Sequence, residues 1–238
     1  MIRLFNGDCL EILKDISSNS VDLVICDLPF GCIGTSWDVS INLENFWKEI
    51  KRIRKDDHSP CLHFCTTRYG FELWESNKKE FRYDIVWSKS NGVGFLTANK
   101  MPLRSHEMIY VFSKAGSYYE RIDISGNFPR AGGGRSGGQQ VYGSSYETVQ
   151  PDNEGKRCMK SVLECANKKT KGGHPTTKPV ELYKLLIERY CPRGGTVLDP
   201  TFGSGNSGLA CQELGRNYIG IEKDKGFFDK AKAKLISL

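Results

Sequence analysis

Two short segments near opposite ends of the chain carry residues whose types and spacing suit a common chemical site. Asp27-Leu28-Pro29-Phe30 follows the apolar run 21–26, and Asp199-Pro200-Thr201-Phe202-Gly203-Ser204-Gly205 follows the apolar run 196–198. Such a run that leads into a loop with Pro or Gly is typical of the carboxyl end of a buried parallel strand. Open α/β sheets bind ligands at that edge, so both segments are candidates for one site.

The glycine-rich segment is suited to a nucleotide-like ligand. Gly203 and Gly205 allow close approach of the backbone, and a helix expected from Asn206 points its positive end at the loop. Glu222 lies about 20 residues further on, after the next expected strand, where an acid can accept hydrogen bonds from a ribose diol. The glycine spacing alone is weak, because glycines in a structural tight turn give the same pattern.

The acidic segment is suited to a planar aromatic amine. The lone pair of such an amine is delocalised into the ring, and two acceptors aimed at its hydrogens free that pair for attack. The Asp27 carboxylate and the Leu28 carbonyl are candidate acceptors, Pro29 fixes the turn, and Phe30 offers a stacking face. The alternative is a strand end whose Asp caps a loop and whose Phe belongs to the core.

The elements that must position these segments follow an α/β pattern. The chain opens as β-α-β and closes as β-α-β-α, and apolar periodicity fades in between. Strands are predicted at 2–6, 21–26, 60–66, 83–88, 107–112, 196–198 and 218–221, and helices at 9–16, 43–53, 71–79, 179–190, 206–214 and 227–236. We therefore predict one α/β domain that carries an insertion.

Length, charge and cysteine usage narrow the class of protein. The 238 residues suit one domain, and no stretch approaches the roughly 20 apolar residues of a membrane span. The first eight residues lack a signal-peptide pattern, and the nine cysteines are scattered through apolar runs. We expect a soluble intracellular protein without a disulfide framework, and the net charge of +6 is compatible with a polyanionic partner.

Most of the segment from 116 to 171 is polar and basic, and it cannot build a large core. Its Lys and Arg can neutralise phosphates, although a solvated loop is the alternative for any single residue. The candidates for contact with a polyanion are Arg130, Arg135, Lys156 and Arg157.

Cys61, His63 and Cys65 alternate in a way that can suggest a metal site. The alternation suits one face of a strand, and no second thiol pair stands at zinc-finger spacing. We predict no metal.

Taken together, the motifs resemble those of the β-group S-adenosylmethionine-dependent DNA amino-methyltransferases, from one end of the chain to the other. That family has a D-P-P-Y-type catalytic motif near the amino terminus, a variable target-recognition region, and an F-x-G-x-G cofactor motif near the carboxyl terminus. The same order occurs here, with Phe202-Gly203-Ser204-Gly205 as the cofactor motif. The resemblance implies a Rossmann-like methyltransferase fold, a mostly parallel twisted sheet with helices on both faces and circularly permuted motifs.

The resemblance also assigns residues to roles. It implies catalysis by residues 27–30 and S-adenosylmethionine binding by a larger set. That set is Asp8, Asp199, Pro200, Phe202, Gly203, Gly205, Glu222, Thr176 and Lys178. Trp87-Ser88-Lys89 and His106-Glu107 resemble recurring family positions to which we assign no chemistry.

The implied division of the chain is a catalytic half at 1–115, a target-recognition insertion at 116–172 and a cofactor-binding half at 173–238. The implied partner is DNA, with a homodimer and a cognate restriction nuclease as further partners that the sequence does not specify. The resemblance implies a cytoplasmic protein encoded by a prokaryote or a phage.

Leu28 departs from the family motif, which has Pro at that place. Leu can still supply the backbone carbonyl as an acceptor, but without the Pro ring we expect a looser loop.

Asp rather than Ser at the first place of the motif resembles the adenine-modifying members, so we favour adenine-N6 over cytosine-N4. A nicotinamide oxidoreductase, an RNA or protein methyltransferase and a non-catalytic DNA-binding module are the alternatives, which cofactor binding and substrate preference distinguish.

Overall fold

The computed structural model describes residues 1–29, 41–125, 156–167 and 177–236. The chain divides into two units, residues 1–120 with 161–238, and residues 121–160. In the described part of the second unit, β6 (Ile124–Ser125) pairs antiparallel with β7 (Lys156–Arg157). That unit lies within the predicted insertion 116–172.

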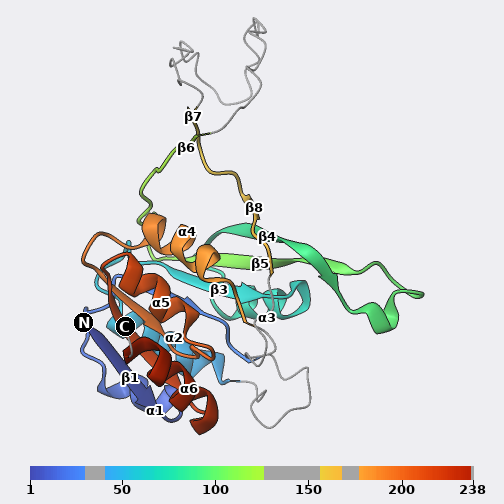
Figure 1. The fold of residues 1–238 in the computed structure, drawn as a ribbon. Coiled ribbons are helices and arrows are strands. Elements are labelled where there is room, and N and C mark those ends of the chain that lie inside the picture. The colour runs from blue at the N-terminus through green and yellow to red at the C-terminus, as the bar shows by residue number, and fades with distance from the viewer. Residues whose placement is uncertain (30–40, 126–155, 168–176, 237–238) are drawn as a thin grey trace, which may run out of the picture. The chain divides into compact units, whose positions relative to one another are not determined.

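The first unit contains one eight-stranded sheet with the order β1-β10-β9-β2-β3-β5-β4-β8 (Figure 1). From β1 to β3 all neighbours are parallel, whereas β5 runs antiparallel to both β3 and β4. The strands of this sheet are β1 (Ile2–Asn6), β2 (Leu23–Cys26), β3 (Cys61–Cys65), β4 (Phe81–Val93), β5 (Arg104–Phe112), β8 (Val162–Glu164), β9 (Thr196–Asp199) and β10 (Asn217–Glu222). The predicted Rossmann-like α/β fold is confirmed.

Helices cover both faces of this sheet, and Figure 1 shows α4, α5 and α6 together on the near face. The helices are α1 (Cys9–Ile12), α2 (Leu43–Ile53), α3 (Thr67–Ser76), α4 (Val180–Tyr190), α5 (Asn206–Glu213) and α6 (Lys225–Ile236), with 3₁₀ turns η1 (Leu13–Asp15) and η2 (Phe95–Thr97). The apolar stripe of α2, with Phe46, Trp47, Ile50 and Ile53, is buried in a core cluster that includes Val24 and Cys61. Burial of this stripe explains why the helical periodicity was readable in the sequence.

Two predicted helices differ from the observed ones by three or more residues at an end. The helix expected at 9–16 ends at Ile12 and continues as the 3₁₀ turn η1. The helix expected at 71–79 spans Thr67–Ser76, because the side chain of Thr66 caps its start by accepting the N–H of Tyr69 at 3.4 Å.

The two strands that precede the candidate motifs are direct neighbours. In the register of β2 with β9, Leu23 pairs with Val197 and Val24 pairs with Leu198. Because the strands are parallel, their carboxyl ends reach the same edge of the sheet, which confirms that the two motifs lie side by side.

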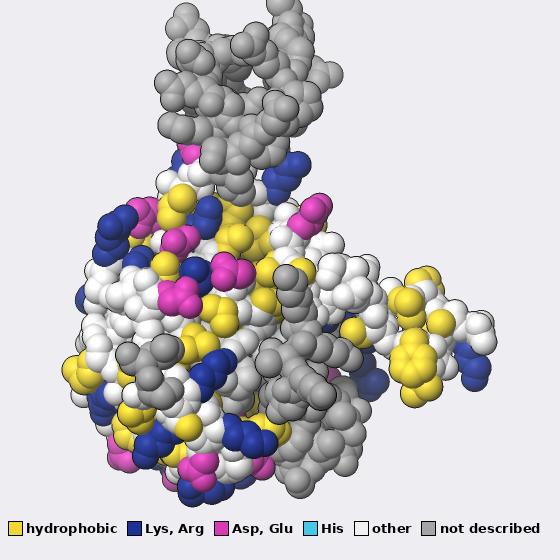
Figure 2. Space-filling view, viewed as in Figure 1, with side chains coloured by type: hydrophobic (Ala, Val, Ile, Leu, Met, Phe, Trp, Pro, Cys, Tyr) yellow, Lys and Arg dark blue, Asp and Glu magenta, His cyan; other side chains and the backbone are white. Residues whose placement is uncertain are grey.

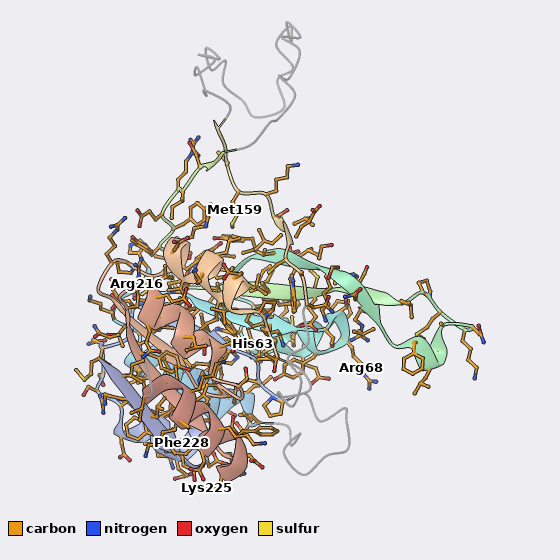
Figure 3. The ribbon with its side chains drawn as sticks, viewed as in Figure 1. His63, Arg68, Met159, Arg216, Lys225 and Phe228 are labelled. Carbon is orange, nitrogen blue, oxygen red and sulfur yellow. The ribbon has the colours of Figure 1, made fainter. Side chains whose placement is uncertain are left out.

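Cys61, His63 and Cys65 lie on β3 and are buried. His63, labelled in Figure 3, has Nδ1 2.9 Å from the carbonyl oxygen of Phe64, and burial lowers its pKa to about 4. The imidazole is therefore neutral and part of the core. In the described ranges, no group of three or more His, Cys, Asp or Glu side chains is placed to hold a metal ion.

No helix among the described residues has the length and apolar character to span a membrane.

Candidate active site

The loop after β9 has the backbone geometry that its glycines predict. Gly203 and Gly205 have φ angles of 50° and 74°, in the left-handed region that favours glycine. A Cβ at Gly205 would lie 3.0 Å from the Cβ of Ala231 on α6. Helix α5 follows at once, and within the described part of the chain no side chain caps its N-terminus. Its first N–H groups are therefore available to an anionic group of a ligand.

Asp199, which is buried, stabilises this loop through hydrogen bonds. Its carboxylate accepts the N–H of Thr201 at 3.1 Å and the hydroxyl of Ser207 at 2.6 Å. Burial raises the pKa of Asp199 to about 7, although both hydrogen bonds act in the opposite direction. Phe202 packs against Phe228 of α6, with ring centroids 6.1 Å apart; Figure 3 labels Phe228. The loop is thus held on two sides, and direct contact of Asp199 with a cofactor stays a prediction.

Glu222, at the end of β10, joins the loop to the end of β1. Its carboxylate accepts the N–H of Gly203 at 2.9 Å and that of Asp224 at 2.8 Å, and its carbonyl accepts the N–H of Gly7 at 3.0 Å. A carboxylate has about four acceptor positions, so further hydrogen bonds can be accepted. Asp8, next to Gly7, accepts the N–H of Leu10 and the Lys223 ammonium, each at 3.0 Å. Three segments predicted to bind the cofactor therefore meet at one edge.

Asp27 lies beside this loop at the end of β2. Its carbonyl accepts the hydroxyl of Thr201 at 3.1 Å, and its carboxylate is bonded by the ammonium of Lys178. The backbone carbonyl of Lys178 accepts the side-chain amide of Asn206 at 2.7 Å, at the start of α5. Lys178, predicted to bind the cofactor, thus ties the acidic motif to the glycine-rich loop.

A row of alternating charges extends from Asp27 to the base of the β4–β5 hairpin. The Lys178 ammonium lies 3.4 Å from one Glu107 oxygen, and Lys89 bonds the other. The same ammonium lies 5.1 Å from the centre of the Phe64 ring, and Lys178 is only 5% exposed. The row Asp27, Lys178, Glu107, Lys89 is neutral in sum, which reduces the cost of burying four ionised groups.

Burial and neighbouring charge compete at this row. Burial raises the pKa of Asp27 above its ordinary value although Lys178 acts against it. At Glu107 the two lysines outweigh burial and lower the pKa. At Lys178 burial acts to lower the pKa, but Asp27 and Glu107 outweigh it and raise the pKa. Lys178 therefore stays charged and favours the carboxylate form of Asp27.

Leu28 is an anchor for the acidic motif. Its side chain is 1% exposed and belongs to the same core cluster as Ile50 and Leu198. Packing therefore holds the motif at Leu28, while residues 30–40 lie outside the described residues and a looser loop stays a prediction.

Leu28→Ala is expected to lower the free energy of unfolding by about 2–5 kcal/mol, because it removes buried methyl groups and leaves a cavity. Chemical denaturation measures the change against wild type. Phe71→Ala, at a side chain that is 66% exposed, is the control and is expected to have little effect. A loss below about 0.5 kcal/mol would show that Leu28 does not anchor the loop.

Several predicted site residues have no described side chain. Phe30, Thr176, Arg130 and Arg135 lie outside the described residues. Lys156 and Arg157 form β7 of the second unit, where only the backbone is described. Their roles stay predictions.

The sequence alone did not show that Lys89, Glu107 and Lys178 form one row with Asp27. The only signal was that Trp87-Ser88-Lys89 and His106-Glu107 resemble recurring family positions.

The fold and this paired site define a class, the Rossmann-like methyltransferases that use S-adenosylmethionine. A family model described as DNA methylase, for N6 and N4 methyltransferases, matches residues 21–233. The chain belongs to this DNA amino-methyltransferase family, whose cofactor is S-adenosylmethionine.

Relatives of the chain are type II methyltransferases. The chain is 32% identical to M.XycI of Xanthomonas campestris pv. cyanopsidis, over 98% of this chain and 87% of that protein. It is 28% identical to M.HinfI of Haemophilus influenzae, over 98% of this chain and 67% of that protein.

Solved structures share the fold. The M1.HpyAVI–SAM complex superposes with a TM-score of 0.66 at 24% identity, covering 99% of this chain and all (100%) of that chain. The PvuII DNA methyltransferase, described as cytosine-N4-specific, superposes with a TM-score of 0.70 at 16% identity, covering 97% of this chain and 85% of that one.

Proposed function

We propose that this DNA methyltransferase transfers a methyl group from S-adenosylmethionine to the N6 amino group of adenine, with the target base flipped out of the duplex. The observation that carries the proposal is the position of Asp27. Its carboxylate is held by the buried ammonium of Lys178, and its carbonyl is hydrogen-bonded to Thr201 of the glycine-rich loop. An acceptor for amine hydrogens thus lies directly beside the segment suited to the methyl donor.

The described residues fit S-adenosylmethionine. The open N-terminus of α5 and the left-handed glycines suit its carboxylate, and the remaining acceptor positions of Glu222 suit its ribose hydroxyls. Asp8, close to Glu222 across the β1–β10 pair, is the proposed contact for the adenine ring of the cofactor. When bound, the cofactor supplies an electrophilic sulfonium methyl group.

The role of the acidic motif is to prepare the amine. One Asp27 oxygen and the Leu28 carbonyl accept the two amine hydrogens, and Phe30 stacks on the base. The nitrogen lone pair forms the new N–C bond as the C–S bond breaks, and the surplus proton leaves to water or to Asp27. Orientation and fixed acceptor dipoles supply most of the rate enhancement. Because the target amine lies inside a stacked duplex, the base must leave the stack first.

We further propose that segment 116–172 reads the DNA, with Arg130, Arg135, Lys156 and Arg157 among the phosphate or base contacts. Asp27 at the first motif position supports adenine by family association. The same acceptors also suit the N4 amine of cytosine, which is the second candidate acceptor.

The proposal is tested by incubating the protein with tritiated S-adenosylmethionine and duplexes that contain or lack adenine. Label that requires adenine supports the proposal. Label on duplexes without adenine would show that cytosine is the acceptor. Label on RNA or protein but not on DNA contradicts the proposal.

Glu222→Ala is expected to raise the Kd for S-adenosylmethionine about 10-fold or more. It removes both the acceptor for the cofactor and the hydrogen bond from Gly203 that shapes the loop. Calorimetric titration measures the affinity, and Glu213→Ala on the exposed side of α5 is the control. An unchanged Kd would remove Glu222 from the cofactor site.

A further inference from the structure

The hairpin of β4 and β5 extends beyond the sheet as an exposed arm, residues 88–106 (Figure 1). Every residue from Ser90 to His106 is exposed. The arm nevertheless has a defined conformation, with Ser88 paired to His106 and Val93 to Arg104 across the two strands.

The arm is braced at its stem and closed at its tip. The side-chain amide of Asn167 accepts the N–H of Asn91 at 3.0 Å and donates to the Asn91 carbonyl at 3.1 Å. At the tip, the carbonyl of Gly94 accepts two hydrogen bonds from Thr97, one from its backbone N–H at 3.0 Å and one from its side-chain hydroxyl at 2.9 Å. A preformed arm loses little conformational entropy when it binds a partner.

Large apolar side chains gather at the tip of the arm in solvent, which Figure 2 shows as hydrophobic side chains beside a basic one. Phe95 and Leu96 are 77% and 86% exposed. The others are Val93, Met101 and Leu103. Exposed apolar side chains grouped on one protrusion mark an interaction surface rather than a stray residue.

The charge of the arm identifies the kind of partner. Between 88 and 106 the chain has Lys89, Lys100 and Arg104 and no Asp or Glu. Lys89 is bonded to Glu107, so Lys100 and Arg104 are the cations exposed for a partner. The cations complement a polyanion, and the apolar tip complements stacked apolar faces. Duplex DNA offers phosphates to the first and bases to the second.

The position of the stem supports the same partner. Lys89 and Glu107 belong to the charge row that ends at Asp27, so the arm begins at the candidate active site. Between the pairs Ser88–His106 and Val93–Arg104, strand β4 has a register shift and β5 advances by two residues, roughly 7 Å at about 3.4 Å per residue. The tip lies beyond this stretch, at least about two base-pair steps of 3.4 Å from the stem, so it can contact DNA that flanks the target base.

We propose that the arm is a second DNA-binding element, in which Phe95 and Leu96 insert between or against bases beside the target and Lys100 and Arg104 contact phosphates. The proposal rests on the proposed function only in taking Asp27 as the site where the target base is bound.

The test is binding of the full chain to a 30-base-pair duplex, measured by fluorescence anisotropy. Phe95→Ser combined with Leu96→Ser is expected to raise the Kd about 10-fold or more. Phe71→Ser, an exposed apolar side chain on α3, is the matched control and is expected to stay within twofold of wild type. Lys100→Gln with Arg104→Gln is expected to reduce the slope of log Kd against log salt by about two.

A spectroscopic variant reports on the tip itself. The added emission of Phe95→Trp is expected to be quenched by duplex DNA, because the indole stacks on bases. Unchanged affinity, salt slope and emission would overturn the proposal. It is equally overturned if the tip variants change only self-association in sedimentation. Failure of adenine methylation would contradict the proposed function without affecting these binding measurements, so the two failures are distinguishable.

Discussion

Asp27→Ala is expected to lower the rate of methyl transfer at saturating substrates by about 10³-fold. The substitution removes the acceptor that frees the amine lone pair, and groups of this kind contribute about 10²–10⁴-fold. Single-turnover transfer of tritium to DNA measures the effect. The affinity for S-adenosylmethionine is expected to change little, because the predicted cofactor residues other than Thr176 and Lys178 follow β1, β9 and β10.

The control for this variant is Asp57→Ala, which removes an exposed carboxylate paired only at the surface with Lys114. It is expected to have wild-type activity. If Asp27→Ala keeps more than a tenth of wild-type activity while it binds DNA and cofactor, Asp27 is not the acceptor.

Lys178→Met is expected to shift the acid limb of the pH–rate profile to higher pH. Burial already raises the pKa of Asp27, and Lys178 opposes that rise. The active form requires the Asp27 carboxylate, so activity is lost as pH falls through the pKa of this group. Without the ammonium the pKa rises further, and the loss therefore occurs at higher pH.

The same variant is expected to reduce stability by about 3–5 kcal/mol, because it leaves two buried carboxylates without their shared partner. Lys178→Arg keeps the charge and is expected to leave the acid limb near its wild-type position. The pH profile of kcat separates the two effects, since a merely structural role would lower activity at every pH without moving the limb. An unmoved acid limb in Lys178→Met would show that Lys178 does not control the ionisation of Asp27.

The buried elements could be predicted from the sequence. Strand β3 is buried along its whole length and appears as a nearly continuous apolar run, whereas helix α2 buries one face and shows the helical period. The pairing of β2 with β9 followed from the order of the motifs, because parallel strands place their carboxyl ends at one edge.

The exposed parts could not be predicted in the same way. We expected strands at 83–88 and 107–112, whereas β4 extends to Val93 and β5 begins at Arg104. These outer halves have solvent on both faces, so no apolar alternation marks them. Strand β8 has only three residues and gave no periodic signal.

The charge row was hidden for a different reason. Lys89, Glu107 and Lys178 come from distant segments, and only the tertiary fold brings them to Asp27. In one sequence these buried ionic residues cannot be told from the lysines and glutamates of the surface, because neither kind follows a periodic pattern.

The central claim is that an adenine amino group accepts the methyl group beside Asp27. The most direct measurement is digestion of methylated duplex DNA to nucleosides, followed by mass spectrometry, for wild type and Asp27→Ala. The account predicts N6-methyldeoxyadenosine for wild type and about 10³-fold less for the variant. N4-methyldeoxycytidine as the product, or N6-methyldeoxyadenosine at similar yield from both proteins, would contradict it.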